Sequence, residues 1–228
     1  MNGEWAQRTE LLIGEDGVRK LQNSFIAVAG LGGVGGHCTE ALARAGIGKL
    51  HLIDSDVVQP SNLNRQLIAT RETVGMLKTA AMRQRLCMVS DCEVTSSEVF
   101  ITPETVEEAF SAGEPDFIVD AIDSVQGKLA IAAYARSHGI PMISCLGAGN
   151  RLDASAFYIT DIFQTSGDPL ARKFRSMLRK AGIGELPVVI SREPASRAEG
   201  QTVIGSIAPV PGAEGLAAAS YVIRKLLA

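Results

Sequence analysis

One stretch decides the fold of this chain: Phe25-Ile-Ala-Val-Ala-Gly-Leu-Gly-Gly-Val-Gly35. Its first half is a short apolar run, which is typical of a buried parallel strand. Four glycines follow at close spacing: Gly30, Gly32, Gly33 and Gly35. Glycine lets backbone N–H groups approach a phosphate closely, and the N-terminus of the helix that follows favours negative charge. The stretch therefore predicts a nucleotide-binding α/β fold.

Strands and helices alternate outward from this loop. After the strand at 25–30, we expect strands at 50–53, 93–99, 116–120 and 141–145. Helices are expected at 33–45, 74–88 and 126–138, and another begins at Thr102-Pro103, where Thr102 is the N-cap. This alternation predicts a Rossmann-like, mostly parallel sheet with helices on both faces.

The last third of the chain extends this fold. We expect strands at 156–160 and 187–190, a basic helix at 170–180 capped by Asp168-Pro169, and a closing helix at 212–227. The polar segment 192–201 is expected to be a mobile loop. We therefore expect a single domain over 1–228, in which 1–150 form the nucleotide-binding half and 151–228 a substrate-side extension.

Composition excludes several classes of protein. The 228 residues are 46% apolar and carry a net charge of −3, so a basic field over the whole surface, as in many nucleic-acid-binding proteins, is absent. No apolar run is long enough to cross a membrane, and the N-terminus lacks the apolar core of a signal peptide. The four cysteines form no CxxC pair, so the usual zinc and redox signatures are absent. We expect a cytoplasmic protein without a membrane partner.

A phosphate-binding set follows the second strand. Asp54 ends that strand, 24 residues after Gly30, where a carboxylate can bind a ribose hydroxyl. An arginine and a lysine beside one phosphate loop suit a triphosphate better than a pyrophosphate bridge, which favours ATP over a nicotinamide cofactor. The residues expected to bind ATP after the glycines are Asp54, Asp56, Asn62, Asn64, Arg65, Gln66 and Lys78.

Two aspartates close the fourth strand, in Asp120-Ala-Ile-Asp-Ser124. Ligands of open α/β sheets bind beyond the carboxyl ends of the strands. A carboxylate there can hold Mg²⁺ against a polyphosphate. We expect Asp123 to be the metal ligand and Asp120 to cap the following helix.

Together these motifs resemble the ubiquitin-activating-type adenylyltransferases, over about residues 7–150. The resemblance implies ATP and Mg²⁺ as cofactors, a carboxylate substrate, an acyl-adenylate product and a homodimer. It implies catalytic roles for Arg65, Lys78 and Asp123. Arg8 is similar to an N-terminal arginine of this family that reaches the ATP of the partner subunit.

The second half indicates the branch. Sulfur-carrier activators generally carry two CxxC zinc pairs and a later catalytic cysteine, whereas no cysteine follows Cys145 here. The segment 161–184 and the ending 205–215 instead resemble the tRNA threonylcarbamoyladenosine dehydratases. That resemblance implies a tRNA carrying threonylcarbamoyladenosine as substrate. Activation of a small sulfur-carrier protein, with a sulfur-transfer partner, stays as the alternative, and a nicotinamide-dependent or nucleotide-sensing module is a further one.

The basic helix fits an RNA substrate. It places five cations within nine residues: Arg172, Lys173, Arg175, Arg179 and Lys180. Such a cluster can contact phosphates, although a solvated helix face would have the same composition. Cys145 lies near a strand end on the ligand side, but the sequence shows no histidine with an orienting partner nearby, so we do not expect a nucleophile.

Overall fold

The computed structural model describes residues 3–196 and 200–228, and within them one seven-stranded sheet has the order β3-β2-β1-β4-β5-β7-β6. All neighbouring strands pair in parallel except β6 and β7. The mostly parallel sheet is therefore confirmed, and the strand expected at 156–160 is its antiparallel edge. The strands are β1 (Phe25–Ala29), β2 (Lys49–Ile53), β3 (Glu93–Ser97), β4 (Phe117–Asp120), β5 (Met142–Cys145), β6 (Phe157–Asp161) and β7 (Pro187–Ser191).

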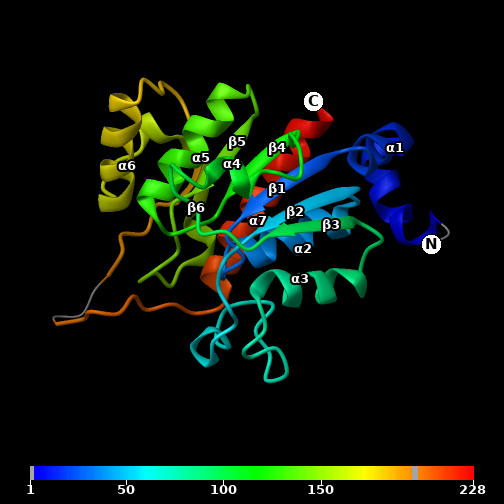
Figure 1. Cartoon of the computed structure of the whole chain (residues 1–228), viewed down its shortest axis with the longest axis horizontal. Helices are drawn as coiled ribbons and strands as arrows, with labels where there is room; N and C mark the ends of the chain where they lie inside the picture. The colour runs from blue at the N-terminus through cyan, green and yellow to red at the C-terminus, as the bar shows by residue number, and fades with distance from the viewer. Residues whose placement is uncertain (1–2, 197–199) are drawn as a thin grey trace.

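Helices cover both faces of the sheet (Figure 1). Helices α4, α5 and α6 enclose one apolar core, and α1, α2, α3 and α7 enclose the other. No described helix is long and apolar enough to cross a bilayer. The helices are α1 (Gln7–Gln22), α2 (Gly35–Ala45), α3 (Lys78–Cys87), α4 (Val106–Ala109), α5 (Val125–Ser137), α6 (Pro169–Lys180) and α7 (Pro209–Leu227), with short 3₁₀ turns η1 (Gly3–Ala6), η2 (Pro60–Asn62), η3 (Ala154–Ala156) and η4 (Ile162–Gln164).

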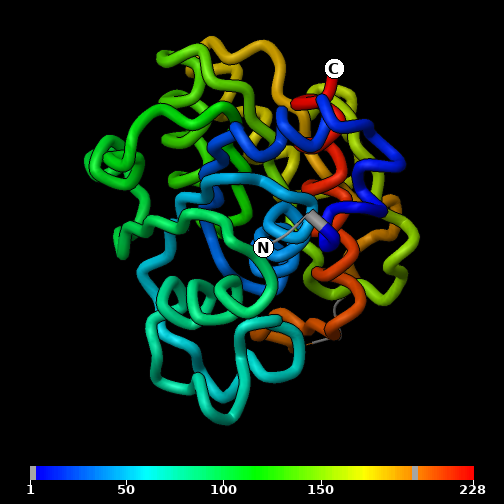
Figure 2. The backbone as a smooth tube through the Cα atoms, turned by 90° about the vertical axis from the view of Figure 1, so that its right-hand side faces the viewer, coloured from blue at the N-terminus to red at the C-terminus, as the bar shows by residue number. Residues whose placement is uncertain are grey.

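A long loop at 54–77 extends beyond the end of the sheet (Figure 2). The helix expected from Val74 begins only at Lys78, because the preceding residues pair with the start of this loop. Val57 forms a β-bridge with Leu77, and Gly75 has a φ of 90°. The expectation of a helix from 74 was wrong at its start for that reason, and the loop becomes part of the site.

The helix expected at Thr102 is shorter than predicted. The carbonyl of Thr102 accepts hydrogen bonds from the N–H groups of Thr105 and Val106, so the residues after it form a turn, and α4 begins at Val106. The expected helix start was therefore wrong and Thr102 is not the N-cap of α4, but its Oγ1 caps the preceding turn by accepting from the N–H of Glu104 at 3.2 Å. The cap expected at Asp168 is confirmed, since its carboxylate accepts from the N–H of Ala171. The loop expected at 192–201 lies partly outside the described residues, at 197–199.

Candidate active site

A cleft of about 1370 Å³ opens at the carboxyl ends of the parallel strands. The glycine loop after β1 lines it, together with Asp54 after β2 and Asp123 after β4. Its far wall comes from 149–151, at the junction of the two halves, and from 166–170 and 191–195 in the C-terminal extension. Ligands of open α/β sheets bind at this end. The topology thus brings the expected nucleotide-binding residues and the extension to one cleft.

The glycines of the loop have different reasons to be glycine. A Cβ on Gly30 would lie 2.7 Å from the carbonyl oxygen of Ala121, and one on Gly35 would lie 1.7 Å from the carbonyl oxygen of Gly30. Gly30 thus lets the loop approach the turn after β4, and Gly35 lets the start of α2 approach the end of β1. Gly32 differs, because the nearest atom to its Cβ position is 3.8 Å away, on the side chain of Gln66. Gly32 leaves open space in the cleft, as a phosphate-binding position requires.

Asp54 holds the glycine loop in place. Its side chain is 8% exposed and accepts hydrogen bonds from the N–H of Leu31 at 2.7 Å and of Asp56 at 2.9 Å. Burial raises the pKa of Asp54, against the opposing effect of Lys78. An ionised carboxylate has about four lone-pair sites. Asp54 can therefore keep both backbone contacts and still accept a ribose hydroxyl.

Two cations flank the phosphate end of the cleft. Lys78, the first residue of α3, is buried, and its Nζ lies 2.7 Å from a carboxylate oxygen of Asp56 and 3.7 Å from Asp54. Arg65 is half-buried, and its Nη1 donates to the carbonyl of Ser61 at 2.9 Å and to Oδ1 of Asn64 at 2.8 Å. Both residues line the cleft, so the expected arginine and lysine face one volume.

Three amide residues of the loop were expected to bind ATP, and their environments differ. Asn62 caps η2, where its Oδ1 accepts from the N–H of Gln59 at 2.9 Å. Asn64 does not line the cleft, and it donates to the carbonyl of Ser206 at 2.9 Å. Gln66 is buried beside Gly32, and its Oε1 has no hydrogen-bond partner among the described residues. An unpaired buried acceptor is costly, so Gln66 is the amide best placed to receive a donor from a bound nucleotide.

The two aspartates after β4 have opposite environments. Asp123 is exposed at the cleft and has no hydrogen-bond partner within the described chain. Asp120 is fully buried and does not cap α5 as expected; the cap is Ser124, whose Oγ accepts from the N–H of Gly127 at 3.2 Å. That expectation was wrong because the carboxylate of Asp120 binds a cation instead.

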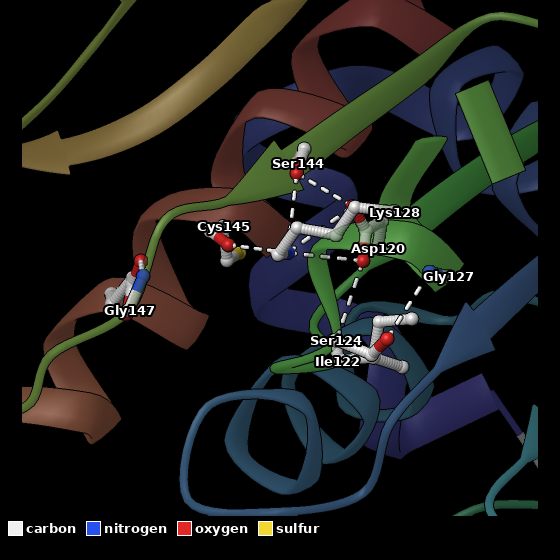
Figure 3. Close-up of polar contacts among 9 residues, drawn as sticks. Asp120, Ile122, Ser124, Gly127, Lys128, Ser144, Cys145 and Gly147 are labelled. Atoms are coloured by element: carbon white, nitrogen blue, oxygen red, sulfur yellow. Dashed lines mark hydrogen bonds and ion pairs between the residues drawn. The ribbon is translucent and has the colours of Figure 1, made fainter. Parts of the chain in front are cut away.

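The cation is Lys128, a residue that the sequence reasoning missed (Figure 3). Its Nζ lies 3.1 and 3.2 Å from the carboxylate oxygens of Asp120 and donates to the carbonyl of Cys145 at 2.7 Å. The Oγ of Ser144 also donates to Asp120, at 2.6 Å. This network joins the carboxyl ends of β4 and β5 beneath the cleft. The sequence did contain a signal for this role. Lys128 lies on the buried face of α5, where most of the other residues are apolar.

Cys145 lies on the cleft wall but is not poised to react. It is 3% exposed, and burial raises its pKa well above the usual value for a thiol. A thiol in apolar surroundings is inert because the thiolate is the nucleophile. The expectation of no nucleophile here agrees with this burial.

The chain is similar to known proteins over most of its length. Residues 6–228 match the family model described as the ThiF family. The chain belongs to the ThiF family. It is 38% identical, over 96% of its length and 93% of the relative's, to the tRNA threonylcarbamoyladenosine dehydratase of Bacillus subtilis (strain 168). It is 41% identical, over 77% of its length and 66% of the relative's, to the protein of that name in Escherichia coli (strain K12).

Solved structures agree with the family membership. The crystal structure of E. coli tRNA N6-threonylcarbamoyladenosine dehydratase, TcdA, in complex with ATP is similar to this ThiF family chain with a TM-score of 0.90 and 36% identity, over 98% of this chain and 95% of the other. A structure of the same protein in complex with AMP has the same scores. The likeness therefore covers both the glycine-loop half and the extension.

The extension of this ThiF family chain is held by a buried arginine. Arg151 is 6% exposed, and its Nη2 lies 2.7 Å from the carboxylate of Asp168, the N-cap of α6. Its Nε donates to the carbonyl of Glu193, and its Nη1 donates to the carbonyls of Gly147 and Gly149. One guanidinium thus ties three segments of the cleft wall together.

The basic helix lies beside the cleft rather than in it. Pro169 and Leu170, its first residues, line the cleft, whereas none of the five cations does. Arg175 donates to Oγ1 of Thr165, and Arg179 lies over the ring of Phe163. The other three are exposed without a side-chain partner in the described chain: Arg172, Lys173 and Lys180.

Arg8 lies apart from the other expected residues. It is exposed on α1 and does not line the cleft of its own chain. Helices α1 and α6 lie at opposite ends of the molecule (Figure 1). Arg8 therefore does not join the other expected residues within one chain.

Proposed function

We propose that this ThiF family protein is an ATP-dependent dehydratase that adenylates the carboxylate of threonylcarbamoyladenosine in tRNA and cyclises it. One observation carries the proposal: a single cleft joins a nucleotide-type end to a wall built from the C-terminal extension. Relatives named for this activity match the extension as well as the glycine-loop half. We place the reaction in the cytoplasm, with no membrane partner.

The chemistry explains the need for ATP. A carboxylate is a poor electrophile because its leaving group would be oxide. In the proposed first step, a carboxylate oxygen attacks the α-phosphorus of ATP, and pyrophosphate leaves. In the second step, the ureido oxygen of the same modified nucleoside attacks the activated carbonyl, AMP leaves with the former carboxylate oxygen, and a ring closes. Ring closure within one molecule depends mainly on orientation, so a covalent cysteine intermediate is unnecessary.

The described residues have clear roles in such a reaction. The backbone N–H groups at the glycine loop bind phosphate oxygens, with Gly32 leaving them room. Asp54 holds the ribose, and Arg65 and Lys78 stabilise the charge that develops as pyrophosphate leaves. Arg8 contributes from the partner subunit of a homodimer, and its absence from the lining of the cleft of its own chain supports this role.

The cleft also fits Mg²⁺, with Asp123 as the protein ligand. Mg²⁺ is usually held by one or two carboxylates together with substrate phosphates. Asp54 and Asp56 are paired with Lys78, whereas Asp123 is exposed and unpaired among the described side chains. No cluster of three metal-binding side chains occurs in that part of the chain, so phosphate oxygens would complete the coordination. The ion would neutralise part of the negative charge on the phosphates.

The sulfur-carrier alternative has weaker support. The sulfur carrier protein ThiS adenylyltransferase of B. subtilis is 35% identical over 65% of this chain, whereas the dehydratase of the same organism matches over 96%.

The test is mass analysis of tRNA nucleosides. Modified tRNA, ATP and Mg²⁺ are incubated with the protein, and pyrophosphate release is followed in parallel. We expect a modified nucleoside that is lighter by the mass of one water. We also expect one pyrophosphate to be released from ATP for each nucleoside converted. Arg65→Ala and Asp123→Ala should abolish both signals, with Arg83→Ala, an exposed arginine on α3, as the matched control. Pyrophosphate release only with a Gly-Gly-tailed carrier protein would overturn the tRNA proposal.

A further inference from the structure

The cleft as a whole is larger than one small ligand needs. Pockets for small ligands usually enclose about 300 to 1,000 Å³, whereas this cleft encloses about 1370 Å³. The residues proposed to bind ATP occupy the end formed by the glycine loop and α3. The opposite wall, at 149–151, 166–170 and 191–195, has no part in that binding. This wall is where a second substrate would lie.

Arg192 is the free cation of this wall. It follows β7, lines the cleft and is exposed. Its guanidinium carbon lies 4.8 Å from the ring centroid of Tyr158, on the edge strand β6. Its backbone N–H donates to the carbonyl of Ala156 at 3.0 Å. Stacking on an aromatic ring orders a guanidinium and leaves its N–H groups available to an anion.

The charged neighbours of Arg192 are already occupied. The carboxylate of Glu193 accepts hydrogen bonds from the N–H groups of Leu152 and Asp153, at 2.8 to 3.0 Å. Arg151 is paired with Asp168 and is buried. No acidic side chain of the described residues forms an ion pair with Arg192. No residue of the wall therefore neutralises the charge of Arg192, and the other cation of the wall, Arg151, is already neutralised by Asp168.

The surroundings of Arg192 select the kind of anion. The first residues of α6, Pro169 and Leu170, line the same cleft, and the exposed Arg172 and Lys173 follow them on the helix. Two exposed cations of α6 therefore follow directly on the residues of that helix that line the cleft. A small anionic metabolite would need one such contact, whereas a polyanionic strand that enters the cleft from outside meets several.

We propose that Arg192 is a specificity-determining residue that binds a phosphodiester of the RNA strand beside the reacting adenosine. The guanidinium would hold one phosphate through two N–H groups while its face stays on Tyr158. This contact would set how far the modified nucleoside enters the cleft. The inference rests on the proposed function, since it names how that substrate is held.

The test separates RNA binding from ATP binding. Variants Arg192→Ala and Arg192→Lys are compared with Arg83→Ala in steady-state kinetics with modified tRNA. Arg192→Ala should raise KM for tRNA about tenfold and leave KM for ATP unchanged, and Arg192→Lys should lie between. The slope of log affinity against log salt should fall by roughly 0.7, the value for one contact to a single strand.

Two results would overturn the inference. One is an unchanged KM for tRNA and an unchanged salt slope in Arg192→Ala. The other is a raised KM for ATP, which would place Arg192 on the nucleotide. Tyr158→Leu should weaken tRNA binding less than Arg192→Ala, because the cation remains but loses its aromatic support.

Direct binding of labelled tRNA distinguishes failure of the inference from failure of the proposed function. If the wild-type protein forms cyclic product and Arg192→Ala binds tRNA equally well, only the inference fails. If the wild-type protein binds tRNA without forming product, and Arg192→Ala binds more weakly, the RNA contact stands and the dehydratase activity fails. If the wild-type protein does not bind tRNA, both fail.

Discussion

The Nζ atom of Lys128 lies 3.1 and 3.2 Å from the two carboxylate oxygens of Asp120, and both side chains are almost fully buried. Removing the lysine would leave a buried carboxylate without its cation. We expect Lys128→Met to lower the free energy of unfolding by about 3 to 5 kcal/mol. Urea unfolding followed by circular dichroism measures this, with Lys20→Met on the exposed side of α1 as control. A loss below about 1 kcal/mol, the range of a surface pair, would contradict the role assigned to the network.

Two glycines of the phosphate loop should respond differently to alanine. Gly32→Ala has room for its Cβ and should keep the fold, but it should weaken ATP binding by roughly tenfold or more, because the methyl group occupies the phosphate position. Gly35→Ala should unfold the chain or strongly lower its thermal stability, because its Cβ would lie 1.7 Å from a carbonyl oxygen. Isothermal titration calorimetry measures the affinity for ATP, and differential scanning calorimetry measures the thermal stability. Normal ATP affinity in a folded Gly32→Ala variant would exclude this loop as the phosphate site.

The stability of the protein should depend on pH through Glu214. This glutamate of α7 is fully buried, its Oε1 accepts from the N–H of Gly147 at 2.8 Å, and its Oε2 has no partner among the described residues. Burial raises its pKa to about 7, against the opposing effects of that N–H, Lys128 and Arg151.

The sign of this dependence follows from proton binding. Between about pH 4.5 and 7 the folded chain holds a proton on Glu214 that the unfolded chain has lost, so the contribution to stability falls as pH rises through this window, by about 3 kcal/mol in all. Glu214→Gln keeps an acceptor for Gly147 and cannot ionise. The free energy of unfolding, measured at pH 5, 6, 7 and 8, should therefore fall less with rising pH in the variant than in the wild type. An equal fall in both proteins would refute the assignment.

Cys145 should be dispensable for the chemistry. Its thiol is buried with a raised pKa, and its contact with Lys128 is made by the backbone carbonyl. Cys145→Ala should keep kcat within a few-fold of the wild type and cost about 1 kcal/mol of stability through the lost volume. Single-turnover AMP release measures the first quantity. Loss of the second step alone, with adenylation intact, would show that Cys145 acts as a nucleophile.

The sequence by itself predicted the glycine loop, the alternation of strands and helices, and a set of polar residues most of which line the cleft. These are local patterns: a strand that ends in glycine, a helix that begins after it, and polar residues at strand ends. The residues after Asp54 were predicted to supply polar side chains, but the pairing of Val57 with Leu77 was not predicted, because that contact joins residues distant in the chain.

Only the tertiary structure decided which charged residues are free. Sequence reasoning assigned Asp120 to the cap of the following helix, because nothing local shows that Lys128 folds back onto its carboxylate. It also could not show that Arg175 and Arg179 contact Thr165 and Phe163, while Arg192 lies over Tyr158 and faces the cleft. The physical reason is common to all these cases: a charge is free or neutralised according to neighbours that other strands and helices bring to it, and those neighbours are set by packing rather than by local sequence.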